Sequence, residues 1–187
     1  MYYKIDDRII AWNCLILLIE PPTLYLIEAL LIVFITNKSI FNKNHQKEIR
    51  KNREAIAKKF RQKDIITIKQ IHSNKVVSID NDENIWHNVG GDAMITNKRG
   101  IVLAIQTADC VPILISDKDS TIIGAVHCGW RGSRNNIIKN VSMIFKQKGK
   151  KSLQAVVGPS IQQNSYQVDE EFYLNFCQEK STNKKYF

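Results

Sequence analysis

Residues 124–132, with the sequence GAVHCGWRG, constrain the fold of this chain more than any other stretch. The apolar, β-branched run at 121–126 predicts a buried strand that ends at His127. Gly129 and Gly132 bracket a Trp and an Arg. Because glycine permits tight turns and close backbone approach, this pattern favours a strand-to-helix corner. The stretch therefore predicts an imidazole at the end of a core strand.

Two further segments carry side chains that can bind a metal. Residues 101–106 predict another buried strand, which ends just before Cys110. His72 lies in a turn between two short predicted strands at 65–69 and 75–79. Two His and one Cys match the three protein ligands of a catalytic zinc. We therefore interpret His72, Cys110 and His127 together as a candidate metal site, although each residue alone is more typical of a packing or surface position.

Length and charge limit the class of protein. The chain has 187 residues, which suits a single domain with a sizeable core. Its formal charge is +9, but the Lys and Arg residues are spread along the chain, and we expect most of them on solvent-exposed faces of helices. There is no RNA-binding signature or zinc-finger spacing, so we expect no nucleic-acid partner. Four cysteines without a CxxC pair predict a reduced, cytoplasmic setting.

Periodicity and punctuation predict the remaining elements. Residues 44–60 predict a helix with Asn44 as its N-cap. Ser133 is the expected N-cap of a second helix over 134–148, and Asp169 that of a third helix through 177. Further strands are predicted at 93–96, 113–116 and 153–157.

Residues 1–43 form an atypical apolar segment. The run 15–35 is strongly apolar, but Pro21 and Pro22 divide it into pieces too short to span a membrane. The segment is interpreted as a buried element, a membrane-associated segment, or sequence foreign to the domain that follows. A membrane partner is not expected. We therefore divide the chain into 1–43 and a metal-binding domain at 44–187.

Several short motifs occur in the order and at the spacing of a known family. They are QIH at 70–72, GDA at 91–93, TADCVP at 107–112, HCGWRG at 127–132, GPSI at 158–161 and YQV at 166–168. With this set the chain resembles the YfiH-type proteins, first called multicopper polyphenol oxidases or laccase-domain proteins and now described as purine nucleoside phosphorylases. The resemblance covers about residues 48–187, and the ordered set is far more specific than any single piece.

The resemblance implies an α+β fold, with mixed β-sheets in a sandwich flanked by helices, similar to the catalytic domain of cytotoxic necrotising factor. It implies a zinc enzyme, with copper as the alternative metal, whose ligands fall on His72, Cys110 and His127. The implied reactions are phosphorolysis of adenosine, inosine and methylthioadenosine to free base and ribose 1-phosphate, and deamination of adenosine. A purine nucleoside and phosphate are thus the expected partners. The oligomeric state is not predicted.

Four residues near the candidate ligands are assigned roles as hypotheses. Asp109 is interpreted either as orienting a metal-binding His or as capping the following turn. The guanidinium of Arg131 suits the attacking phosphate, with a structural salt bridge as the alternative. Trp130 suits stacking on a base and equally suits core packing. Gln70 is a candidate polar contact to the substrate.

The sequence also departs from the family. An N-terminal Arg with a Gly/Ser-rich segment is not found in residues 1–43, and family members continue beyond the point that matches Phe187. We therefore expect a C-terminally incomplete domain with weak or absent activity. Three alternatives stay open: a copper polyphenol oxidase, for which four His are few, a hydrolase with Cys110 as nucleophile and His127 as base, and an inactive remnant.

Overall fold

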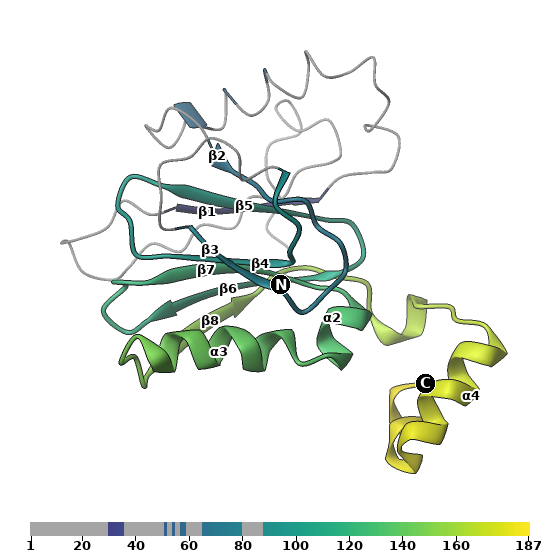
Figure 1. The fold of residues 1–187 in the computed structure, drawn as a ribbon. Helices are drawn as coiled ribbons and strands as arrows, with labels where there is room; N and C mark the ends of the chain where they lie inside the picture. The colour runs from purple at the N-terminus through teal and green to yellow at the C-terminus, as the bar shows by residue number, and fades with distance from the viewer. Residues whose placement is uncertain (1–29, 36–50, 52–53, 55–56, 59–64, 80–87) are drawn as a thin grey trace.

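The computed structural model describes residues 30–35, 51, 54, 57–58, 65–79 and 88–187 (Figure 1). Within them lie two β-sheets. The smaller sheet has the order β1-β5-β2, formed by Leu30–Ile35, Val102–Thr107 and Ile65–Ile66, and both of its pairings are parallel. The larger sheet has the order β3-β4-β7-β6-β8. Its strands are β3 (Val76–Ser78), β4 (Ala93–Thr96), β7 (Ile123–Cys128), β6 (Val111–Asp117) and β8 (Leu153–Val157).

The larger sheet is mixed. β3 pairs with β4 in parallel, whereas the pairs β4–β7, β6–β7 and β6–β8 are antiparallel. The smaller sheet covers one face and helix α3 (Ile137–Gln147) covers the other (Figure 1). This arrangement confirms the predicted α+β fold with mixed sheets flanked by helices.

Two hydrophobic clusters fill the spaces between these layers. Met94, Leu103 and Leu114 belong to the cluster that joins the two sheets. Ile95, Val126 and Phe145 belong to the cluster between the larger sheet and α3. Successive strand residues point to opposite faces, so β7 contributes Ala125 to the first cluster and Val126 and Cys128 to the second. His127 therefore points to the same face as Ala125.

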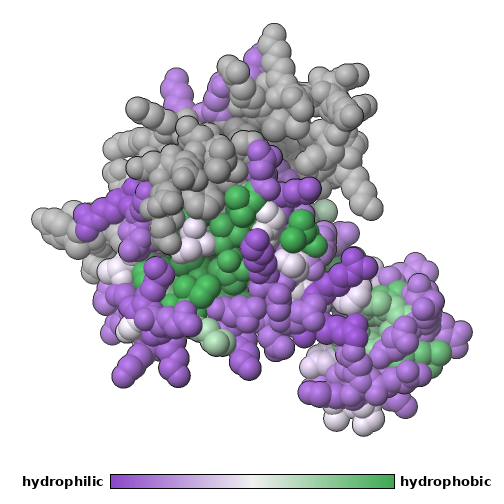
Figure 2. All heavy atoms as spheres, in the orientation of Figure 1, coloured by the Kyte–Doolittle hydropathy of each residue, from purple (hydrophilic) through white to green (hydrophobic). Residues whose placement is uncertain are grey.

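The C-terminal segment forms a separate lobe at one end of the sheets (Figure 1). It contains η4 (Gln163–Ser165), α4 (Glu170–Glu179) and η5 (Ser181–Tyr186). The Asp169 side chain accepts a hydrogen bond from the amide of Phe172, which confirms the predicted N-cap. The rings of Phe172, Phe176 and Phe187 pack together, and Figure 2 shows hydrophobic atoms gathered on this lobe.

The helix predicted at 134–148 is wrong at its start. The structure has a short helix α2 (Trp130–Arg134) and then α3, which begins only after Asn136. Asn136 has φ 63°, the left-handed conformation that Asn tolerates better than most residues. This residue breaks the helical path, so Ser133 lies within α2 and is not an N-cap.

The N-terminal predictions are only partly covered. Of residues 1–43 the structure describes 30–35, which form β1 alongside β5. Residues 51, 54, 57 and 58 are helical, as predicted for 44–60, and the other residues of that predicted range lie outside the described residues. In the part of the chain that the structure describes, no helix is long and apolar enough to cross a membrane. The domain division at residue 43 stays a prediction.

Candidate metal centre

His127 is the buried side chain at the end of β7. It is 3% exposed, and its Nδ1 lies 2.8 Å from Oδ1 of Asp92. Asp92 immediately precedes β4, the strand paired with β7 on one side. The backbone repeats the link, because the amide of His127 donates to the carbonyl of Asp92 at 2.7 Å. With Nδ1 engaged, Nε2 is the nitrogen of His127 left for a metal.

The same carboxylate holds the turn that carries His72. It accepts hydrogen bonds from the backbone amides of Ile71, His72 and Ser73, at 3.3, 2.9 and 2.6 Å. The Ser73 hydroxyl also donates to it at 2.8 Å. His72 has φ 57°, a left-handed conformation that is uncommon for a residue with a side chain. These contacts to Asp92 stabilise the turn in that conformation.

Gln70 fastens the start of this turn to the smaller sheet. Its amide Nε2 donates to the carbonyl of Gln106 at 2.7 Å, and its Oε1 accepts from the amide of Gln106 at 2.7 Å. Both ends of the Gln70 side chain are therefore occupied at the end of β5. We conclude that Gln70 positions the His72 turn.

The candidate ligands of the three segments converge. One donor atom from each of His72, Cys110 and His127 lies within 4.8 Å of the other two. The imidazole rings of His72 and His127 meet edge to face, with centroids 4.9 Å apart. Gly129 makes room for the cluster, since a Cβ at this position would lie 3.0 Å from Cδ2 of His72 and 3.3 Å from Sγ of Cys110.

The electrostatics of the cluster are set by burial and by the Asp92–His127 pair. Burial alone would lower the pKa of His127, but its contacts with Asp92 and Cys110 raise that pKa to about 9. Burial would likewise raise the pKa of Asp92, but hydrogen bonds from His127 and the His72 turn lower it to about 2. A buried anion thus faces the back of the imidazole, which increases its basicity toward a metal.

The chemistry of the donor set fits a metal ion. Imidazole and thiolate donors suit zinc and also copper. Three protein ligands leave a fourth position for water or substrate, as in catalytic zinc sites. A metal-binding His usually donates its other N–H to a carboxylate, and Asp92 supplies that carboxylate to His127. His72, Cys110 and His127 are therefore the residues that would hold the ion.

The carboxylate in contact with a candidate ligand is Asp92, whereas Asp109 is exposed and lines a pocket. The two roles expected for Asp109 stay predictions. The sequence does carry a signal for Asp92, a carboxylate after two glycines and directly before the apolar strand 93–96, but the same pattern is typical of a turn. A carboxylate beside a strand that is buried on both faces is itself buried, and burying it costs free energy unless it is hydrogen bonded.

Trp130 and Arg131 begin helix α2. The Trp130 ring packs edge to face on Phe172 of α4, at 4.9 Å between centroids, which matches its packing interpretation. The guanidinium of Arg131 lies 5.0 Å from the centre of the Trp130 ring, and the side chain is exposed. Among the described residues the ion pair in this helix is made by Arg134, with Glu179. Arg131 is thus left to solvent or to a ligand.

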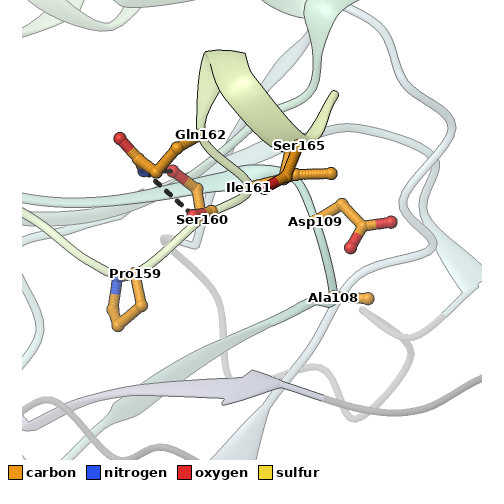
Figure 3. Close-up of a pocket in the computed structure, with 7 residues that line it drawn as sticks. All are labelled: Ala108, Asp109, Pro159, Ser160, Ile161, Gln162 and Ser165. Carbon is orange, nitrogen blue, oxygen red and sulfur yellow. Dashed lines mark hydrogen bonds between the residues drawn. The ribbon is translucent and has the colours of Figure 1, made fainter. Parts of the chain in front are cut away.

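A pocket of about 370 Å³ is lined in part by the two residues that precede Cys110 (Figure 3). Ala108 and Asp109, just before Cys110, form one wall, and residues of the segment 159–165 form the facing wall. Tyr166 follows that segment. Burial raises the pKa of Tyr166, and the negative charges of Cys110 and Asp109 raise it further, so its phenol lies in the field of both groups.

Cys128 follows His127 and packs in the core. It is buried in the cluster between the larger sheet and α3, and burial raises the pKa of its thiol to about 12. Cys177 is partly exposed on α4. Cys14, His45 and His87 lie outside the described residues.

The chain matches known proteins in sequence. Residues 35–187 match the family described as multi-copper polyphenol oxidoreductase laccase. The chain is 43% identical over 146 residues to purine nucleoside phosphorylase RC0672 of Rickettsia conorii, covering 78% of this chain and 60% of that protein. It is 37% identical over 117 residues to adenosine deaminase RL5 of an unknown prokaryotic organism, covering 58% of this chain and 45% of RL5.

Solved structures show the same fold. YfiH of Bacillus licheniformis superposes with a TM-score of 0.61 at 23% identity, covering 71% of this chain and 54% of that chain. NMB0706 of Neisseria meningitidis superposes with a TM-score of 0.59 at 24% identity, covering 78% of this chain and 58% of that chain. The chain thus spans roughly half to three-fifths of the proteins it matches. It belongs to the multi-copper polyphenol oxidoreductase laccase family, the YfiH-type proteins.

Proposed function

We propose that this chain binds one zinc ion through His72, Cys110 and His127 and catalyses the phosphorolysis of purine nucleosides. The observation that carries the proposal is the convergence of these three donors within 4.8 Å, with Asp92 behind His127. Relatives named purine nucleoside phosphorylase support the reaction class. The substrates are inosine, adenosine and methylthioadenosine, together with phosphate.

The residues divide the work as follows. Asp92 holds the His72 turn and the His127 ring, so that two ligands are preorganised by one carboxylate. Arg131 binds the attacking phosphate, because its fork of N–H donors matches phosphate oxygens. Phosphate oxygen attacks C1′ of the ribose as the C1′–N9 bond breaks, and the base leaves with the bonding electrons. A bound metal supplies Lewis acidity at this centre.

The proposal is tested by following hypoxanthine release. Purified, zinc-loaded protein is incubated with inosine and phosphate, and the products are separated by chromatography. We expect release that requires phosphate and is lost in Cys110→Ala. Release that persists in Cys110→Ala, or an absence of release from a folded, zinc-loaded protein, would contradict the proposal.

Adenosine deamination is a second candidate. A relative named adenosine deaminase RL5 favours it, and the open position beside three metal ligands suits activation of water. The two reactions separate cleanly, because deamination converts adenosine to inosine without phosphate. Inosine and ammonia formed in phosphate-free buffer would support deamination, and their absence would contradict it.

A further inference from the structure

The pocket of Figure 3 has one charged side chain in its lining. Asp109 contributes a carboxylate to its wall, and the residues facing it are uncharged. Among the residues that the structure describes, no cation lies within ion-pair distance of Asp109. An unneutralised carboxylate repels phosphate, but it accepts hydrogen bonds from hydroxyl groups. The pocket therefore suits a neutral molecule rich in O–H donors.

The pocket walls are held in place by backbone contacts. The amide of Ile161 donates to the carbonyl of Asp109 at 3.0 Å, and the amide of Gly158 donates to the carbonyl of Pro112 at 2.9 Å. Within the facing wall, Nε2 of Gln162 donates to the carbonyl of Ser160 at 3.0 Å (Figure 3). The pocket is therefore fixed before a ligand arrives, which reduces the entropy lost on binding.

The position of the pocket links it to the reacting centre. Asp109 is the covalent neighbour of Cys110, so one wall of the pocket belongs to the segment that carries a candidate metal ligand. The volume of about 370 Å³ falls in the range of small-molecule sites.

We propose that this pocket holds the ribose of the nucleoside, with Asp109 accepting hydrogen bonds from the 2′- and 3′-hydroxyls. The proposal rests on the proposed function for the identity of the substrate. It assigns the sugar to Asp109 and the phosphate to Arg131. A carboxylate that accepts from a vicinal diol selects ribonucleosides over nucleosides that lack the hydroxyls, since loss of the donors leaves the carboxylate unpaired.

The test uses binding, which does not depend on turnover. Dissociation constants of the full, zinc-loaded chain are measured by calorimetry for inosine and for 2′,3′-dideoxyinosine. We expect inosine to bind at least about 10-fold more tightly than the dideoxy compound, because hydrogen bonds to a charged group add to the binding free energy. Asp109→Asn and Asp109→Ala should remove most of this preference by weakening inosine alone.

Asp119→Asn is the matched control. It removes one exposed carboxylate from the turn after β6, at the other end of the strand from Asp109. This control should keep the preference for inosine. Equal affinities of the parent chain for the two nucleosides would overturn the ribose site. So would an unchanged preference for inosine in both Asp109 variants, or Asp109 variants that bind both nucleosides equally more weakly.

Failure of this inference is distinguishable from failure of the proposed function. Hydroxyl-dependent binding that requires Asp109, without hypoxanthine release, supports the pocket and contradicts the phosphorolysis. Phosphorolysis whose preference for ribonucleosides is unchanged in the Asp109 variants supports the proposed reaction and overturns the proposed ribose pocket. Absence of nucleoside binding to the folded, zinc-loaded chain overturns the pocket as well.

Discussion

Asp92 and His127, 35 residues apart, are joined twice: Oδ1 of the carboxylate lies 2.8 Å from Nδ1 of the imidazole, and the two backbones are hydrogen bonded. The other hydrogen bonds of this carboxylate go to the turn that carries His72. One buried side chain therefore fixes two of the three candidate ligands relative to each other. The geometry of the metal centre depends on Asp92 as much as on the ligands.

We expect about one zinc per chain in protein purified without chelator. His72→Ala, Cys110→Ala and His127→Ala should each deplete it, because a site with three protein ligands loses most of its affinity when one is removed. Elemental analysis of the purified variants measures the content. Full zinc retention in all three variants would refute the metal centre.

Asp92→Asn should weaken zinc binding about 10–100-fold, as is typical when the partner of a metal-binding His is lost. The amide also replaces one acceptor oxygen with a donor that faces donors, so the melting temperature should fall. A competition titration with a zinc chelator measures the affinity.

Asp117→Asn serves as the control for Asp92→Asn. Asp117 is 2% exposed, accepts from the amide of Ile122 and pairs with Lys150, but it lies at the opposite end of β6 from Cys110. This variant should lower the melting temperature without changing zinc affinity. Equal zinc affinities in both Asp variants would show that Asp92 is merely structural.

The strands that carry the site could be predicted because they are long, apolar and clearly bounded. β5, β7 and β8 lie within about two residues of the predicted ranges, and the ends of β5 and β7 bring Cys110 and His127 together. The role of Asp92 could not be predicted, because it depends on the pairing of β4 with β7 across 26 intervening residues. Local sequence likewise does not indicate that Gln70 hydrogen bonds to Gln106 or that the Trp130 ring packs on Phe172, because both partners are distant in sequence.

The pKa shifts predict how the stability of the metal-free chain depends on pH. Asp92 has its pKa lowered from 3.8 to about 2, so its contribution is present above pH 3.8 and is lost as the pH falls through 2. His127 has its pKa raised from 6.5 to about 9, so its contribution is fully present below pH 6.5 and is lost as the pH rises through 9.

Thermal unfolding in the presence of chelator should therefore show a melting temperature that declines between pH 6.5 and 9. In His127→Gln the decline should be smaller, because the neutral amide does not titrate. Identical slopes in the two proteins would assign the decline to other groups.

Alkylation of Cys110 separates a metal ligand from a catalytic nucleophile. A thiolate bound to zinc should react slowly with iodoacetamide until a chelator is added, whereas a free nucleophile reacts at once. The variant Cys177→Ser removes the other partly exposed thiol of the described residues. Rapid labelling of Cys110 in the zinc-loaded protein, located by mass spectrometry, would favour the hydrolase alternative.

Arg131→Met should raise the KM for phosphate about 10-fold or more, since it removes charged hydrogen bonds to the anion. The affinity for inosine should change little. Arg134→Met is the matched control on the same helix, because Arg134 already pairs with Glu179. Initial rates at varied phosphate concentration measure the effect. Similar KM values for both variants would remove Arg131 from the phosphate site.

The convergence of three backbone amides on one carboxylate also has a kinetic consequence. The amides of Ile71, His72 and Ser73 all donate to Asp92, and the next residue, Asn74, is tied to Asn135 and Asn140 at the other side of the turn. The three amides can therefore exchange with solvent deuterium only when the turn opens as a unit. Their shared exchange rate therefore measures how often the turn that carries His72 opens. This measurement does not require that any substrate is turned over.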